Sequence, residues 1–277
     1  MLSHLDRKLW RDLNRLKGQA LAVALVMGCG LAMMIMARSL IFSLESTRRD
    51  YYEANRFADL FVQLKRAPNS LATRIGEIPG VATVQPGISV LVTLDVAGLD
   101  EPASGSVRSL PDLGAPQLNS LFLRVGRWLS PGARGEVLVS EAFAEANQLT
   151  PGDRIAMLLN GKRQELQIAG IVLSPEIIFE SRPGAALPDS RTYGTFWMPY
   201  KELARAFDLD GAFNSLALTL APGSAERPVI AEIDHLLTPY GGRGAIGRED
   251  HPSHIRVSDE IRVLQTMSVG FPVVFLS

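Results

Sequence analysis

A short polar stretch near the carboxyl end, Glu249-Asp250-His251-Pro252-Ser253-His254, places several potential metal ligands side by side. Two histidines three positions apart beside two carboxylates could bind Zn²⁺. Pro252 lies between the histidines, however, and proline breaks the helix that would align their side chains. No further ligand follows at a suitable spacing. We therefore interpret 249–254 as a solvated linker, and an envelope hydrolase that uses this cluster is the least favoured alternative.

Motifs for phosphate binding and covalent catalysis are missing from the sequence. No Gly-x-x-x-x-Gly-Lys-Ser/Thr occurs, so the chain lacks the loop with which P-loop ATPases hold phosphates. The glycine-rich segment 241–244 has no Lys-Ser/Thr after it and is interpreted as a turn. Neither Ser-x-x-Lys nor Gly-x-Ser-x-Gly is present. The sequence therefore predicts a non-catalytic chain, and we assign it no catalytic residue, cofactor site or metal site.

The composition bounds the fold and excludes one class of function. The chain has 277 residues, 47% of them hydrophobic, with a net charge of -1 and a pI near 6.4, enough for one or two domains with a core. This charge balance provides no basic face, so no nucleic-acid partner is expected. Cys29 is the only cysteine, and no intrachain disulfide can form. An outer domain without disulfides fits the bacterial envelope better than a small secreted scaffold.

The chain is organised around the uncharged stretch from Gly18 to Ala37, GQALAVALVMGCGLAMMIMA. A helix needs about twenty apolar residues to cross the hydrocarbon core of a bilayer, and without proline each backbone N–H can pair inside the segment. A buried core helix of this length would be unusual. A cleaved signal peptide would have a shorter apolar region and an Ala-x-Ala-like cleavage site. The sequence predicts an uncleaved transmembrane helix over 18–43.

Basic residues flank this helix unequally, which predicts its orientation. More of them precede the helix than follow it, namely Arg7, Lys8, Arg11, Arg15 and Lys17 against Arg38, Arg48 and Arg49. The positive-inside rule therefore places the amino terminus in the cytoplasm and the main domain outside the bacterial inner membrane. Residues 1–17 combine a leucine stripe with a basic face, which predicts an amphipathic helix in the cytoplasmic interface. A soluble helix packed on a partner subunit is the alternative.

Small residues recur every four positions in the predicted span, at Ala20, Ala24, Gly28 and Ala32. This spacing places them on one helix face, where they allow the close backbone approach by which membrane helices commonly pack. Small residues are also frequent in any membrane helix. We interpret the stripe as a helix-packing surface.

A second hydrophobic run closes the sequence over 258–277. It has roughly seventeen apolar residues, fewer than a bilayer span needs, and no basic flank follows it. We expect the chain as given to stop inside a second transmembrane helix, so that two spans would bracket the outer domain.

The outer domain begins and ends with alternating strand and helix patterns. Strand-like runs at 59–64, 81–84 and 88–96 surround a helical pattern at 70–78, and a strand at 216–220 precedes a helix at 226–237. This order predicts a split βαβ arrangement that is interrupted by an insertion.

The insertion is β-rich. Its first part, 98–117, is dominated by Gly, Pro, Ser and Asp, which marks a boundary. The run 136–139 predicts a strand, after which Ser140 caps a short helix with Glu141 in its first turn. Asn160-Gly161 between two apolar runs is typical of a β-hairpin. The expected fold class is α+β.

Three features follow one another between Gly126 and Val172. They are Gly126-Arg127-Trp128, then Gly135-Glu136-Val137-Leu138-Val139-Ser140-Glu141, and then Gly152-Asp153 followed by Ile168-Ala169-Gly170-Ile171-Val172. In this order they resemble the periplasmic core domain of the MacB/FtsX-like ABC transporter permeases. The resemblance extends to the topology of nearly the whole chain. It implies a split ferredoxin-like lobe over 44–97 plus 208–256 and an inserted β-rich lobe over 98–207.

The resemblance also implies a function. The chain would be the N-terminal portion of a permease subunit that couples ATP hydrolysis by a partner to movement of a periplasmic domain, for export, lipoprotein release or envelope signalling. Expected partners are a cytoplasmic ABC ATPase subunit, a second permease copy or a paralogue, and the lipid bilayer. A periplasmic adaptor or substrate is left open. The fused ATPase of some members is absent. The alternative is a membrane-anchored periplasmic sensor or binding module without an ATPase.

Overall fold

The computed structural model describes residues 16–96, 99, 101–132, 134–178, 180, 182 and 189–276. The predicted interfacial helix over 1–17 therefore lies almost entirely outside the described residues. The chain divides into two compact units, which are considered separately below. One takes its described residues from Met1–Asp50 and Arg256–Ser277, and the other is Tyr51–Ile255.

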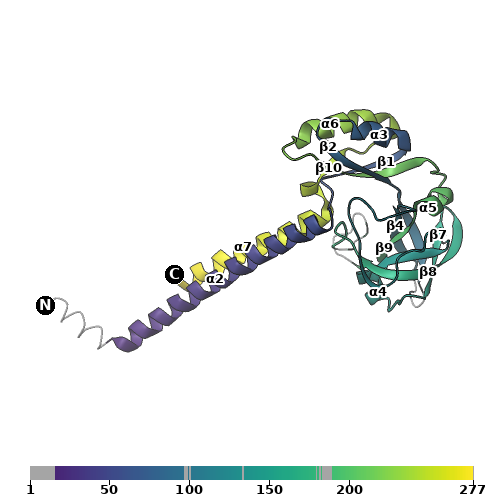
Figure 1. Cartoon of the computed structure of the whole chain (residues 1–277). Coiled ribbons are helices and arrows are strands. Elements are labelled where there is room, and N and C mark those ends of the chain that lie inside the picture. Colours follow the sequence, from purple (N-terminus) through teal and green to yellow (C-terminus); the bar gives the residue numbers. More distant parts are fainter. Residues whose placement is uncertain are drawn as a thin grey trace. The chain divides into compact units, whose positions relative to one another are not determined.

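The first unit consists of two long helices. Helix α2 spans Lys17–Ala54, and helix α7 spans Pro252–Leu276. Figure 1 shows them side by side. Arg48 donates a hydrogen bond of 3.0 Å to the hydroxyl of Ser258, and Gln265 donates one of 3.4 Å to Glu45. Because the earlier residue of one helix faces the later residue of the other, the two helices run antiparallel.

Among the described helices, α2 alone is long and apolar enough to cross a membrane. Its most apolar window has a mean hydropathy of 2.4, and only 6% of that window is buried. A core helix of a soluble protein would be mostly buried, so the exposed apolar surface of α2 favours lipid as its surroundings. The second span predicted over 258–277 lies within α7 and stays a prediction.

The stripe of small residues in α2 faces away from the rest of the chain. Ala24, Gly28 and Ala32 are exposed, and Ala20 is half-buried. A different stripe of α2 is less exposed, at Gly30, Met34, Ala37 and Ile41. The surface predicted for helix packing is thus free within the described chain, and its use by a partner helix stays a prediction.

The second unit begins and ends in a ferredoxin-like lobe, which we define by its four-stranded sheet of order β11-β1-β10-β2. All neighbouring strands are antiparallel. Helices α3 and α6 pack on the sheet through Leu71, Ile75, Val229 and Ile233. The elements are β1 Leu60–Pro68, α3 Asn69–Gly76, β2 Val81–Gly87, β10 Ala212–Leu220, α6 Glu226–Leu237 and β11 Ala245–Gly247. This arrangement confirms the predicted split βαβ halves. Strand β11 was not predicted, because three residues beside a glycine-rich turn carry no strand pattern.

The inserted segment forms a barrel lobe, defined by seven strands of order β5-β8-β6-β9-β4-β3-β7. Strand β7 also pairs with β8, so six of the strands close into a barrel around which β5 forms an extra edge. The strands are β3 Ser89–Asp95, β4 Ala103–Leu110, β5 Phe122–Gly126, β6 Glu136–Ser140, β7 Arg154–Leu159, β8 Lys162–Leu173 and β9 Tyr193–Pro199. Two short helices accompany them, α4 Glu141–Ala146 and α5 Tyr200–Ala206. The α+β class with an inserted β-rich lobe is confirmed.

Two parts of the predicted boundary between the lobes are wrong. Strand β3 was placed in the ferredoxin-like lobe but pairs with β4 and β7 of the barrel lobe. An alternating pattern specifies a strand but not its partner, and the composition changes only after residue 96. Strand β4 lies in the Gly- and Ser-rich part that was interpreted as a boundary. Gly105 is needed there, because a Cβ would lie 2.9 Å from the ring of Phe196.

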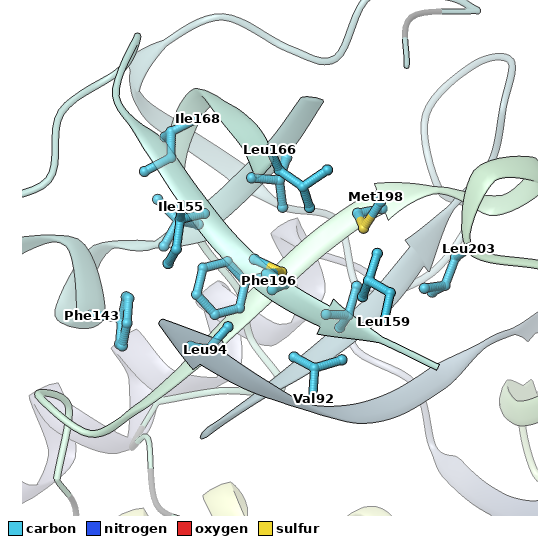
Figure 2. Packing of buried hydrophobic residues seen from close by; sticks show 14 of the residues in the cluster. Val92, Leu94, Phe143, Ile155, Leu159, Leu166, Ile168, Phe196, Met198 and Leu203 are labelled. Carbon is cyan, nitrogen blue, oxygen red and sulfur yellow. The ribbon is translucent and has the colours of Figure 1, made fainter. Parts of the chain in front are cut away.

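The interior of the barrel lobe is filled by apolar side chains from most of its strands and both of its helices (Figure 2). Phe143 of α4 and Phe196 of β9 pack edge to face with 5.2 Å between ring centroids. Figure 2 shows Leu94, Ile155 and Leu166 converging on this pair. Because the barrel is packed solid, any binding surface of this lobe lies on its outside or at its ends.

Candidate functional site

The most densely connected polar region is the junction, which we define as the entry of the chain into the second unit (Tyr51–Phe61) and its exit (Arg248–Ile255). Helix α2 ends within the entry segment. Arg56 adopts the left-handed conformation (φ 49°), its N–H donates to the carbonyl of Glu53, and the N–H of Phe57 donates to that of Tyr52. These bonds form a Schellman cap, which satisfies the last helical carbonyls and turns the chain into β1.

Arg248 ties the exit segment to the entry segment. Its guanidinium donates to the carbonyl oxygens of Phe57 (2.6 Å) and Ala58 (3.0 Å), and to the carboxylate of Asp59 (2.6 Å). Its backbone N–H donates to the carbonyl of Asp59 at 2.7 Å. The guanidinium carbon also lies 5.4 Å from the ring centroid of Phe57, a cation–π distance. A planar fork with five donors suits this convergence of acceptors, which a lysine could not satisfy.

His251 begins helix α7 inside the same cluster. Its ring lies 4.4 Å from that of Phe61 and 5.6 Å from that of Phe57, centroid to centroid. Its carbonyl accepts the N–H of Ile255, and its Nδ1 accepts the N–H of Ser253 at 3.4 Å, so His251 is the N-cap of α7. Burial, with Arg108 and His254 as nearby positive charges, lowers the pKa of His251 to about 3. The imidazole is therefore neutral at physiological pH, as an accepting Nδ1 requires.

This depressed pKa predicts an acid-sensitive junction. Above the ordinary pKa of 6.5 the imidazole is neutral in both folded and unfolded chains, and its stabilising contribution is fully present. As the pH falls from 6.5 toward 3, only the unfolded chain binds the proton, and that contribution is lost. By pH 5 the loss should reach about 2 kcal/mol.

The measurement is the thermal unfolding of wild type and of His251→Asn between pH 7 and pH 5. Asparagine can cap a helix but does not titrate, so the variant should lose less stability than wild type on acidification. The difference between the two proteins is the relevant quantity, because Glu180 titrates in the same range with the opposite sign. Equal acid sensitivity of both proteins would contradict a buried neutral His251.

The barrel lobe is also tied to the junction. The side-chain oxygen of Asn119 accepts the N–H of Ala58 at 2.8 Å, and the N–H of Asn119 donates to the carbonyl of Arg56 at 3.0 Å. On the exit side, the hydroxyl of Ser253 donates to the carbonyl of Glu176 at 2.6 Å. The carboxylate of Glu176 pairs with Arg108 of β4. Both segments through which the chain passes are thus anchored to both lobes.

The predicted linker at 249–254 is therefore corrected. His251 and Ser253 are buried rather than solvated. Pro252 does not break a helix but is the first residue of α7, a position at which its missing N–H costs nothing. His254 stacks near the ring of Tyr52 at 5.9 Å. In the described part of the chain, no three His, Cys, Asp or Glu side chains are grouped so that they could hold a metal ion.

Two glycines of the resembling run form one tight contact in the barrel lobe. Gly126 of β5 pairs with Gly170 of β8. A Cβ at Gly126, where φ is 88°, would lie 2.5 Å from the carbonyl oxygen of Ala169, and a Cβ at Gly170 would lie 2.6 Å from that of Arg127. Both positions require glycine for backbone approach. Gly152 (φ 103°) and Gly135 (φ 72°) serve turns before strands β7 and β6.

The polar members of the run hold loops. Glu136 accepts two bonds from Arg127, which lower its pKa, and one from the N–H of Ser130. Asp153 accepts the N–H and hydroxyl of Thr150, and these bonds lower its pKa. Glu141 pairs with Arg124 at 2.6 Å. Trp128 is 46% exposed. All of these contacts brace the barrel lobe, and none assembles a nucleophile with a base.

Ser140 stands at the N-cap of α4 as predicted, but its side chain does not cap the helix. The buried Glu180 takes part instead: it accepts the N–H of Thr195 at 2.9 Å and bonds the hydroxyl of Ser140 and the N–H of Phe143. Burial raises the pKa of Glu180 to about 7. Glu180, Arg248 and Asn119 were all missed by sequence reasoning, because their partners are remote in the sequence.

Comparison with solved structures finds extracytoplasmic domains of bacterial transporters. The extracellular domain of the noncanonic ABC-type transporter YknZ from Gram-positive bacteria has 12% identity and a TM-score of 0.43, over 68% of this chain and 98% of that one. The periplasmic region of MacB from Actinobacillus actinomycetemcomitans has 12% identity and a TM-score of 0.43, over 76% and 95%. A domain assigned to a permease protein from Porphyromonas gingivalis has 11% and 0.38, over 70% and 90%.

No protein-family model matches the chain, and no curated protein sequence matches it significantly. At identities of 11% to 12%, what the chain has in common with these structures is the fold.

Proposed function

We propose that this chain is the N-terminal portion of a permease subunit in an ABC transport system, in which it transmits movement rather than performing chemistry. A separate cytoplasmic ATPase would supply the energy, since the sequence has no P-loop. The outer unit, Tyr51–Ile255, would be the part that moves. Export, lipoprotein release and envelope signalling are the outputs that such a device could serve.

The observation that carries the proposal is the continuity of α2. This helix is unbroken for 38 residues, from the apolar segment to Ala54, within the second unit. An α-helix transmits rotation and translation only while its hydrogen-bond ladder continues. At the end of α2, the Schellman cap and the bonds of Arg248 and Asn119 fix the following residues. A displacement of the helix would therefore be passed to the outer unit rather than absorbed by a loop.

The membrane placement follows from the surface of α2. Its apolar residues are exposed over the stretch 18–37, for example Leu25 (60%) and Ile35 (64%). Water would disfavour such a surface and lipid would not. We place the amino terminus in the cytoplasm on the basis of the basic residues before α2. The exposed stripe at Ala24, Gly28 and Ala32 is proposed to contact a second permease copy or a paralogue.

The experiment is a purification of the complete gene product in mild detergent, with identification of the proteins that accompany it. We expect an ABC ATPase subunit to copurify, with ATP hydrolysis that changes when the outer unit is removed. A preparation without any ATPase would contradict the proposal and favour a membrane-anchored sensor or binding module. A matched control is the same protein with α2 replaced by an unrelated transmembrane helix, which should lose the ATPase.

A further inference from the structure

An open cavity of about 750 Å³ lies on the outside of the barrel lobe. It is bounded by the loop at 112–113, the turn at 131–134, the β7–β8 hairpin and helix α5. Its volume is within the range of about 300 to 1,000 Å³ that is typical of small-molecule sites. The cavity belongs to a single lobe and shares none of its residues with the junction.

Four cationic side chains line this cavity: Arg134, Lys162, Lys201 and Arg205. They come from three separate elements, and all four are exposed. Elsewhere on the barrel lobe, Arg124, Arg127 and Arg163 form ion pairs with neighbouring carboxylates. Within the described residues, none of the four cavity cations has an ion pair of this kind.

The acids of the cavity are engaged with the backbone instead. Asp112 accepts the N–H of Lys201 at 3.0 Å, and Glu202 accepts the N–H of Gly135 at 2.9 Å. These bonds orient the two carboxylates toward the protein rather than toward the cations. The third acid, Asp208, is exposed at the rim.

Lys201 and Arg205 add a further argument. They are four positions apart on α5, so their side chains share one helix face. Like charges in this relation destabilise a helix slightly unless an anion lies between them. The pair thus favours an occupied cavity over an empty one.

We propose that this cavity binds a small molecule with two or more anionic groups, either phosphates or carboxylates. The cations from three elements would contact different anionic groups of one ligand, which distinguishes the cavity from a site for a single ion. Such binding would be independent of the mechanical role proposed above, and it concerns the outer unit alone.

The test is isothermal titration calorimetry of the full chain in detergent, with pyrophosphate and with citrate as probes at fixed ionic strength. We expect saturable binding of at least one probe. Pyrophosphate alone would indicate a phosphate ligand and citrate alone a carboxylate ligand. Absence of binding by both probes would overturn the proposal.

Matched variants assign the binding to the cavity. Lys162→Gln with Arg205→Gln should weaken the affinity about tenfold, while Arg66→Gln with Arg227→Gln removes the same charge from exposed positions of the ferredoxin-like lobe and should change it less than about twofold. Asp208→Asn should strengthen binding about twofold. It should also fold normally, since asparagine tolerates the positive φ at this position. Equal weakening by both double variants would overturn the proposal, because it would indicate nonspecific attraction.

Discussion

Replacement of Ser43 by proline in the complete permease is expected to reduce its ATP-dependent activity by at least about tenfold. Ser43 lies within α2, between the apolar stretch and the end of the helix at Ala54. Proline removes one backbone hydrogen bond and clashes with the preceding turn, at a cost of about 3 kcal/mol in a helix interior, and it kinks or breaks the helix. A broken ladder cannot pass a displacement from the apolar segment to the residues fixed at the junction.

The activity measurement needs two controls. Ser43→Ala keeps the helix intact and should retain full activity, since alanine has the highest helix propensity. The amount of ATPase that copurifies with Ser43→Pro should equal that of wild type, which separates uncoupling from failure to assemble. Unchanged activity of Ser43→Pro, with the helix shown to be broken, would refute the transmission of movement through α2.

The elements of the fold were predictable where their patterns are local. Helix α6 occupies Glu226–Leu237, the range that its apolar spacing indicates, and Asn160-Gly161 connects β7 to β8 as the turn chemistry requires. The pairing of strands is not local. Nothing in the sequence around β3 distinguishes a partner in one lobe from a partner in the other, since both supply an apolar face.

The junction could not be predicted for the same reason. Arg248 and Asp59 are 189 positions apart, and Ala58 and Asn119 are 61 apart. A lone arginine beside two acids is more often solvated than bound to backbone carbonyls. The signal that could have helped was the aromatic content of the entry segment: Phe57 and Phe61 need buried partners, and the chain must supply them at its exit.

Replacement of Arg248 by methionine is expected to lower the free energy of unfolding of the outer unit by about 2 to 3 kcal/mol. Methionine keeps an apolar stem of similar length but donates no hydrogen bond. The carbonyl of Ala58, in a residue with no exposed surface, and that of Phe57, in a residue with 2% exposed, would lose a charged donor. The measurement is thermal or chemical unfolding of the full chain in detergent, with Arg227→Met as a control at an exposed position.

A double-mutant cycle with Asp59→Asn separates the two kinds of bond that Arg248 makes. The Arg248 and Asp59 side chains are both 32% exposed, so solvent screens their ion pair and its coupling should be at most about 1 kcal/mol. Asparagine keeps an oxygen for the N–H of Leu220, which Asp59 accepts at 2.9 Å, so the cycle adds no second defect. Most of the loss caused by Arg248→Met should therefore persist in the Asp59→Asn background. If the loss vanished there, Arg248 would be an ordinary surface ion pair, and the fixed geometry at the end of α2 would have to come from the Schellman cap and Asn119 alone.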